Sequence, residues 1–218
     1  RDLVRSRGLG DVYKRQTFDD GPGPYTAQLL DVLDKYNVKA TFFVTNTRPD
    51  YRTMIAEEAK RGHTVAIHSA SHVYSQIYQS EDAYFADLEE MNQIIIEQTG
   101  QGAQIIRFPG GSSNTVSAKY SRGIMSRLVK DVEARGFLYC DWNVSSGDAG
   151  SRPISTQQVV QNVTEGMQKN NVSIVLQHDI KEFSVNAVEQ IIQWGLAEGY
   201  TFLPLSTSSP MSHHGVNN

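Results

Sequence analysis

From Thr17 to about residue 204, strand-like and helix-like segments alternate regularly, and this alternation constrains the fold more than any other feature of the sequence. Short β-branched or aromatic runs, such as residues 39–45 and 172–177, alternate with helical apolar stripes such as residues 81–99. Glycines follow most of the helical runs and predict where they end. Regular alternation predicts an α/β fold with a parallel sheet, which can be open or closed into a barrel.

The expected elements fill the chain without a linker rich in Pro, Gly or Ser, so its 218 residues predict one domain. The expected helices are residues 26–37, 50–61, 81–99, 117–135, 155–169 and 183–198. The expected strands are residues 39–45, 63–67, 104–107, 137–142, 172–177 and 200–203, with a further strand leading into Phe18. We therefore predict a domain over residues 17–205, followed by a polar tail over residues 206–218.

Residues 1–16 differ from the rest of the chain. They carry five basic residues against two acidic ones, with no helical stripe and no apolar alternation. They also lack the apolar core of a signal peptide, so targeting cannot be inferred from them. We interpret the segment as a flexible basic arm or as non-native sequence. Non-native sequence there would damage the strand that leads into Thr17.

The composition excludes several classes of protein. A formal net charge of −4 argues against a protein that binds nucleic acid through backbone charge. No run approaches the roughly 18 apolar residues of a membrane span. Cys140 is the single cysteine, so the chain has no intramolecular disulfide, and we expect a buried thiol inside a strand.

Unusual polar residues cluster where the predicted strands end. Because the carboxyl ends of parallel strands in a barrel converge on one face, we expect these residues to meet there. They are Asp19, Asp20, His68, His72, Arg107, Asp141, Asp148, His178 and Asp179.

Two of these clusters have the composition of a metal site. His68 and His72 lie four residues apart, which would put both imidazoles on one face of a helical turn, and two histidines with one carboxylate leave coordination positions open. The alternative is a pair of unrelated loop histidines. Asp19 and Asp20 could be turn or capping residues, but adjacent carboxylates at a buried strand end require a compensating cation. One would then bind metal while the other takes a proton from water.

The remaining polar residues permit two interpretations each. Arg107 begins a glycine-rich loop, where it is either exposed or paired with a site carboxylate. His178 ends the most apolar strand, as a packed core histidine or as a general acid held by a carboxylate. We predict a structural role for His63 and solvated positions for His213 and His214.

The segments TFDDGP (17–22), HSASH (68–72), RFPGG (107–111), DWNVSSGD (141–148) and LQHD (176–179) together resemble the NodB-homology polysaccharide deacetylases, carbohydrate esterase family 4. The resemblance implies a distorted (β/α) barrel with about seven parallel strands. It also implies a zinc enzyme, with Co²⁺, Mn²⁺ or Ni²⁺ as substitutes.

Roles for individual residues follow from the same resemblance. It implies that Asp19 is the catalytic base and that Arg107 holds its carboxylate. His178 matches the general acid, and Asp148 matches the aspartate that tunes it. The resemblance also implies that Asp20, His68 and His72 are the metal ligands. Leu176 matches the wall of the acetyl pocket. Gly110 and Trp142 match positions that contact the substrate, with the backbone N–H of Gly110 serving the oxyanion.

Two positions depart from the family pattern. Gly110 stands where the family often has Tyr or Phe, and Ala149 follows Asp148 where an aromatic residue is common. Both changes predict a more open groove or a different substrate, with the backbone N–H of Gly110 still able to serve the oxyanion.

The resemblance implies removal of N-acetyl groups from a polysaccharide containing GlcNAc or MurNAc, with peptidoglycan as the first choice. Chitin, an exopolysaccharide and O-acetyl xylan remain alternatives, as does an inactive glycan-binding relative. We expect a monomer that acts outside the cytoplasm or at the cell envelope, without a nucleic-acid or protein partner.

Overall fold

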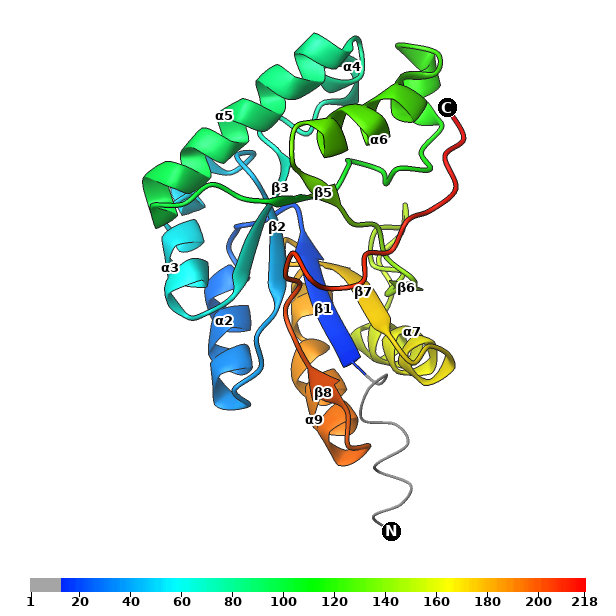
Figure 1. Cartoon of the computed structure of the whole chain (residues 1–218). Helices are drawn as coiled ribbons and strands as arrows, with labels where there is room; N and C mark the ends of the chain where they lie inside the picture. Colours follow the sequence, from blue (N-terminus) through cyan, green and yellow to red (C-terminus); the bar gives the residue numbers. More distant parts are fainter. Residues whose placement is uncertain (1–12) are drawn as a thin grey trace.

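The computed structural model describes residues 13–218, which form a curled parallel sheet with helices on its outer side (Figure 1). The strands follow the order β5-β4-β3-β2-β1-β7-β6, and β8 pairs with β1 beside this path. All the strand pairs are parallel. The expected distorted (β/α) barrel is confirmed. The strands are β1 (Tyr13–Asp19), β2 (Thr41–Thr45), β3 (Thr64–Ser69), β4 (Ile105–Ile106), β5 (Leu138–Tyr139), β6 (Val144–Ser145), β7 (Ser173–His178) and β8 (Thr201–Phe202).

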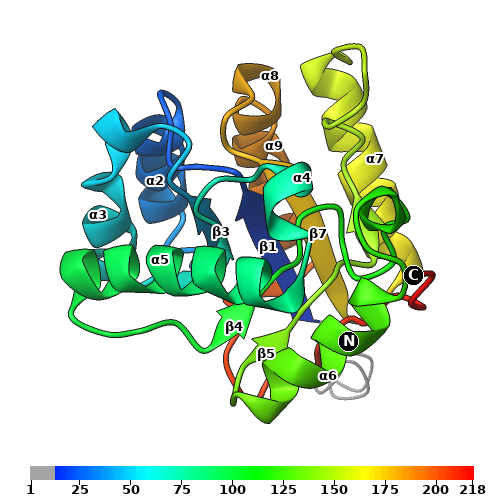
Figure 2. The same ribbon diagram turned by 90° about the horizontal axis from the view of Figure 1, so that it is seen from above.

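Seen from above, the helices surround the strands (Figure 2). The α-helices are α2 (Thr26–Lys35), α3 (Met54–Lys60), α4 (Tyr74–Ile77), α5 (Glu81–Thr99), α6 (Ile124–Ala134), α7 (Thr156–Lys169), α8 (Glu182–Val185) and α9 (Val188–Ala197), with 3-10 turns η1 (Pro49–Tyr51) and η2 (Val116–Lys119). None of these helices is long and apolar enough to cross a membrane.

Local sequence explains the bounds of the longest helix. The Ser80 side chain accepts a hydrogen bond from the Ala83 N–H at the start of α5, and Gly100 ends the helix with φ of 82°. Between them, Leu88, Met91 and other residues of the apolar stripe are buried against the sheet. The predicted bounds, 81–99, are confirmed.

Several expected helices are interrupted. The run 117–135 divides into η2 and α6, with Gly123 at φ of 75° before α6 begins. The run 183–198 divides into α8 and α9, and the run 50–61 into η1 and α3. Neither α4 nor β6 was expected, because both are too short to show a period in the sequence.

The expected strand leading into Phe18 is β1, which begins at Tyr13, four residues before the expected start of the domain, and its backbone pairs with β7 from Lys14 onward. Backbone pairing does not depend on side-chain polarity, so residues 13–16 join the sheet although three are polar and buried. Lys14 Nζ donates to Met167 O at 2.6 Å, and burial lowers the pKa of this ammonium to about 8. Residues 1–12 lie outside the described part, so the interpretation of the leader stays a prediction there.

Alternating residues of the strands face two apolar cores. Phe42 packs in the larger core between the sheet and the helices, whereas Phe43 faces a smaller core inside the barrel. Cys140 lies in the inner core as a buried free thiol, as expected. His63 accepts a hydrogen bond from the Ala40 N–H at 3.0 Å, which agrees with the structural role predicted for it.

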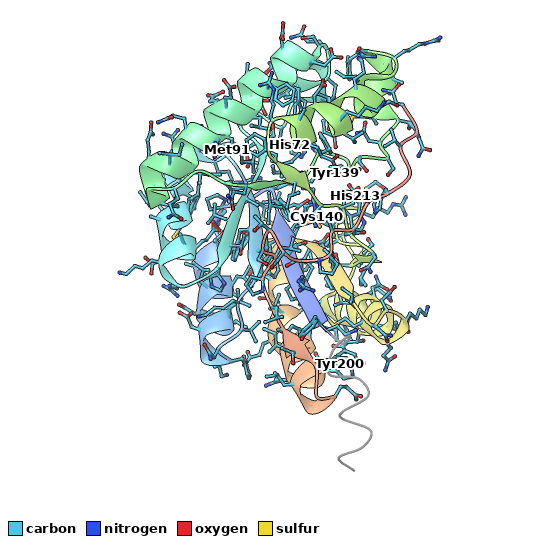
Figure 3. The ribbon with its side chains drawn as sticks, in the orientation of Figure 1. His72, Met91, Tyr139, Cys140, Tyr200 and His213 are labelled. Carbon is cyan, nitrogen blue, oxygen red and sulfur yellow. The ribbon has the colours of Figure 1, made fainter. Side chains whose placement is uncertain are left out.

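The polar tail packs on the domain, so the expected solvated position is wrong for His214, which is half-buried, whereas His213 is exposed although its ring contacts the domain. His213 stacks on Tyr139 with ring centroids 3.7 Å apart, and the two are neighbours in Figure 3. The two ring nitrogens of His214 lie 2.6 Å from Trp142 O and 3.1 Å from Ser113 Oγ. The tail therefore links two loops at the carboxyl end of the sheet, a contact that its polar sequence does not reveal.

Candidate metal centre and catalytic site

Asp20, His68 and His72 form a cluster at the carboxyl ends of β1 and β3. One ligand atom from each residue lies within 4.8 Å of the other two. The Nε2 atoms of His68 and His72 both lie 3.3 Å from Asp20 Oδ1. The structure thus brings together the three side chains expected to hold a metal.

The local backbone that creates this cluster differs from the expected helical turn. His68 lies on β3, which ends at Ser69, and His72 lies in the following loop with φ of 54°. Asp20 also has a positive φ, 77°, directly after β1. These left-handed conformations are uncommon for residues with a Cβ, and they turn both side chains back toward the strand ends.

The cluster fits a divalent metal ion. Asp20 Oδ1 is buried and has no hydrogen-bond partner in the described structure, which a cation would supply. Burial opposes ionisation of Asp20, but the nearby imidazoles of His68, His178 and His72 hold its pKa well below the usual range. His68 Nδ1 donates to Arg107 O at 2.8 Å, so Nε2 is left for coordination. Two imidazoles and one carboxylate suit Zn²⁺ and related ions.

Asp19 and Arg107 form a buried ion pair beside the cluster. Arg107 Nη1 donates to Asp19 Oδ1 at 2.8 Å and to Thr17 Oγ1 at 2.7 Å. Its Nε and Nη2 donate to the carbonyls of Cys140 and Asp141, so the guanidinium is anchored on three sides. The other carboxylate oxygen, Asp19 Oδ2, lies 3.8 Å from His68 Nε2 and faces the cluster.

His178 lies on the other side of Asp20, held by Asp148. His178 Nδ1 donates to Asp148 Oδ1 at 2.7 Å, and its backbone N–H donates to Asp148 Oδ2. Ser184 Oγ donates to the same Oδ2 at 2.6 Å. Burial lowers the pKa of His178, but the hydrogen bond and charge of Asp148, with the charge of Asp20, raise it to about 9. Its Nε2 is 3.8 Å from Asp20 Oδ2, so a protonated imidazole faces the site.

Two glycines shape the loop expected to bind substrate. A Cβ on Gly111 would lie 2.9 Å from the ring of Trp142, so the glycine permits close packing of that ring. A Cβ on Gly110 would lie 3.0 Å from the hydroxyl of Tyr74. Tyr74, from α4, therefore partly fills the opening that the sequence predicts in the groove at Gly110. Leu176 is buried on β7, two residues before His178.

Asp141 and Asp179 do not join the cluster. Asp141 accepts hydrogen bonds from the backbone N–H groups of Ser112 and His214, and so has a structural role. Asp179 Oδ2 accepts from Thr26 Oγ1 at 2.7 Å, and burial raises the pKa of its carboxyl to about 6.

Sequence reasoning missed Asp87, which holds the loop between the two histidines. Its carboxylate accepts from Ser69 Oγ at 2.6 Å, Ala70 N at 3.1 Å and Ser71 N at 2.9 Å. Asp87 lies in the middle of α5, where an acidic residue looks like part of a solvated helix face. No sequence pattern distinguishes it, because its partners come from another element.

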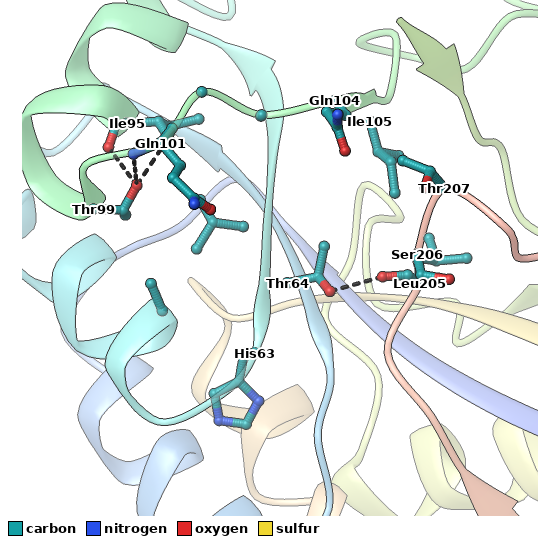
Figure 4. Close-up of a pocket in the computed structure, with 14 residues that line it drawn as sticks. His63, Thr64, Ile95, Thr99, Gln101, Gln104, Ile105, Leu205, Ser206 and Thr207 are labelled. Atoms are coloured by element: carbon teal, nitrogen blue, oxygen red, sulfur yellow. Dashed lines mark hydrogen bonds between the residues drawn. The ribbon is translucent and has the colours of Figure 1, made fainter.

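A cavity of about 490 Å³ lies away from these residues (Figure 4). It is lined by the first residues of β3, the end of α5 and the segment around Leu205. Because His68 is at the opposite end of β3, this cavity belongs to the amino-terminal face of the sheet and not to the cluster.

The convergence of these side chains on the carboxyl face of a curled parallel sheet is typical of the NodB-homology class of (β/α)-barrel hydrolases. A protein-family comparison agrees: residues 13–126, more than half of the chain, match the polysaccharide deacetylase family. The chain belongs to this family, carbohydrate esterase family 4.

Solved structures and curated sequences give the same relationship. The catalytic domain of a peptidoglycan N-acetylglucosamine deacetylase from Eubacterium rectale is 77% identical, with a TM-score of 0.95 over 95% of this chain and 94% of that one. A polysaccharide deacetylase from Bacillus cereus is 30% identical, with a TM-score of 0.79 over 94% and 96% of the two chains. A peptidoglycan-N-acetylglucosamine deacetylase of Bacillus cereus is 31% identical over 85% of this chain and 66% of the relative. The chain thus spans just under two thirds of that curated relative.

Proposed function

We propose that this protein is a metal-dependent N-deacetylase of GlcNAc- or MurNAc-containing polysaccharide, with peptidoglycan as its substrate. The observation that carries the proposal is the placement of an anchored carboxylate, Asp19, and a protonated imidazole, His178, on two sides of the Asp20–His68–His72 cluster. Hydrolysis of an amide needs a base for water and an acid for the departing amine, and these two groups supply them. The peptidoglycan deacetylases among the similar proteins support the choice of substrate.

The chain's own residues would divide the reaction as follows. A divalent cation held by Asp20, His68 and His72, with Zn²⁺ as the first candidate, supplies Lewis-acid polarisation of water and of the acetyl carbonyl. Asp19, fixed by Arg107, accepts the proton of the attacking water. The backbone N–H of Gly110 stabilises the developing oxyanion. His178, oriented by Asp148, protonates the amine, and acetate and the free amino sugar leave.

Leu176 and Trp142 complete the proposed site as walls around the acetyl group and the sugar. A polymeric cell-wall substrate lies outside the cytoplasm, so we also propose an extracellular or envelope location. We also propose a monomeric enzyme.

The test is acetate release from peptidoglycan, N-acetylglucosamine oligomers and acetyl-xylan, each with and without added Zn²⁺. We expect zinc-stimulated release that is fastest from peptidoglycan. Release from acetyl-xylan alone would instead indicate an O-acetyl esterase. Zinc binding and glycan binding without any release would indicate an inactive glycan-binding relative.

A further inference from the structure

Tyr74 lies between the metal cluster and the glycine-rich loop. It is the first residue of α4, two residues after His72, and its ring centroid is 5.6 Å from the His72 ring. On its other side, the ring of Tyr78 lies 5.7 Å away, and the Tyr78 hydroxyl donates to Pro109 O at 2.7 Å. The ring of Tyr74 is therefore fixed by packing next to a cluster residue, and Figure 2 shows α4 in the view onto this face.

The hydroxyl of Tyr74 occupies the space that a side chain at position 110 would need. A Cβ on Gly110 would lie 3.0 Å from the hydroxyl oxygen and 3.5 Å from the ring carbon that bears it. Asn114 Cβ lies at the same 3.0 Å, and contacts this short are tight for a Cβ, so a larger residue at 110 would require Tyr74 or Asn114 to shift by a few tenths of an ångström. Gly110 itself is exposed and offers the groove only its backbone.

This hydroxyl is free to bind substrate. It makes no hydrogen bond to any described residue, in contrast to the hydroxyl of Tyr78. The hydroxyl oxygen is not fully buried, so it is accessible to solvent. Tyrosine combines an apolar ring with one polar tip, which suits contact with a sugar that has both apolar faces and hydroxyl groups.

We propose that Tyr74 determines substrate specificity by forming the groove wall beside the metal cluster and by donating a hydrogen bond from its hydroxyl to the sugar that carries the acetyl group. This inference rests on the proposed function and deepens it. Aromatic recognition of the reacting sugar then comes from the segment after the metal histidines rather than from the loop at residues 107–111.

The test compares the full chain with the variants Tyr74→Phe, Tyr74→Ala and Tyr36→Phe. Tyr36 is the control, because its hydroxyl donates to Glu189 on the outer helices, away from the cluster. We would measure kcat and KM for acetate release from an N-acetylglucosamine pentamer, and zinc content per chain. One lost hydrogen bond predicts a rise in KM of about three- to tenfold for Tyr74→Phe. The rise should be larger for Tyr74→Ala, with zinc content unchanged in both.

An unchanged KM in both Tyr74 variants would overturn the inference, as would a rise in KM that is accompanied by loss of zinc. The second result would mean that Tyr74 supports His72 rather than the sugar. Failure of the proposed function is visible in the wild-type protein alone, because it would release no acetate from any glycan. The two failures are therefore distinguishable.

Discussion

Replacing Gln16 with an apolar residue should stabilise the protein. Gln16 lies on β1 with 1% of its surface exposed, and neither Oε1 nor Nε2 has a hydrogen-bond partner in the described structure. Because residues alternate across a strand, Gln16 faces the same side as Phe18, which packs in the apolar core between the sheet and the helices. An amide group is thus held in surroundings that suit a hydrophobic side chain.

The size of the effect follows from the two unpartnered atoms. A buried polar group without a partner costs about 1 to 3 kcal/mol, so Gln16→Met should raise the free energy of unfolding by about 2 kcal/mol or more. Methionine is unbranched and flexible, and so it can follow the path of the glutamine side chain. For a domain of this size, 2 kcal/mol corresponds to a rise in Tm of about 4 to 8 °C.

Urea unfolding followed by circular dichroism measures this difference. The matched control is Gln177→Met on the neighbouring strand β7, where Gln177 pairs in register with Phe18. Gln177 Nε2 donates to Ser184 O and Ser184 Oγ at 3.1 and 3.0 Å, whereas its Oε1 also lacks a partner, so its replacement should stabilise the protein less than Gln16→Met does. A neutral or destabilising Gln16→Met would refute the reasoning, because it would show that the Gln16 amide is satisfied in solution.

Three further predictions concern the site. Because the pKa of His178 is raised to about 9, this proposed general acid is protonated at neutral pH, and kcat should fall as pH rises through about 9. Asp148→Asn should move this fall about one to three pH units lower, and an unmoved pH–kcat profile would contradict the assigned pairing. His72→Ala should reduce zinc, measured by atomic emission after dialysis, from about one per chain to near zero, whereas His63→Ala should retain it. Asp87→Ala should weaken zinc affinity about 10- to 100-fold, measured by competition with a chelating dye. Unchanged affinity would show that the loop between His68 and His72 keeps its conformation without Asp87.

The sequence predicted the parts of the structure that depend on local pattern. The bounds of α5 follow from Ser80, Gly100 and the apolar stripe between them. The meeting of Asp20, His68 and His72 follows from the parallel sheet, because each lies near the carboxyl end of a strand. The motif resemblance supplied the same three residues.

The remaining features depend on contacts between distant segments, which a single sequence does not encode locally. The start of β1 at Tyr13 was not predicted, because the polar residues 14–16 show no strand pattern and are held in the sheet by backbone pairing with β7. The packing of His213 and His214 on β5 and its loop depends on where the tail runs after β8. Asp87 and Tyr74 also gain their positions from other elements, so only the structure associates them with the site.

The central claim is that Asp19 is the base of a metal-dependent deacetylase, and the variant Asp19→Asn tests it most directly. Asparagine keeps the shape of the side chain and can still accept from Arg107, but it cannot take a proton from water. We predict zinc bound at about one per chain, with acetate release from an N-acetylglucosamine oligomer reduced at least about 100-fold. Acetate release close to that of the wild type, in a variant that still holds its zinc, would contradict the account.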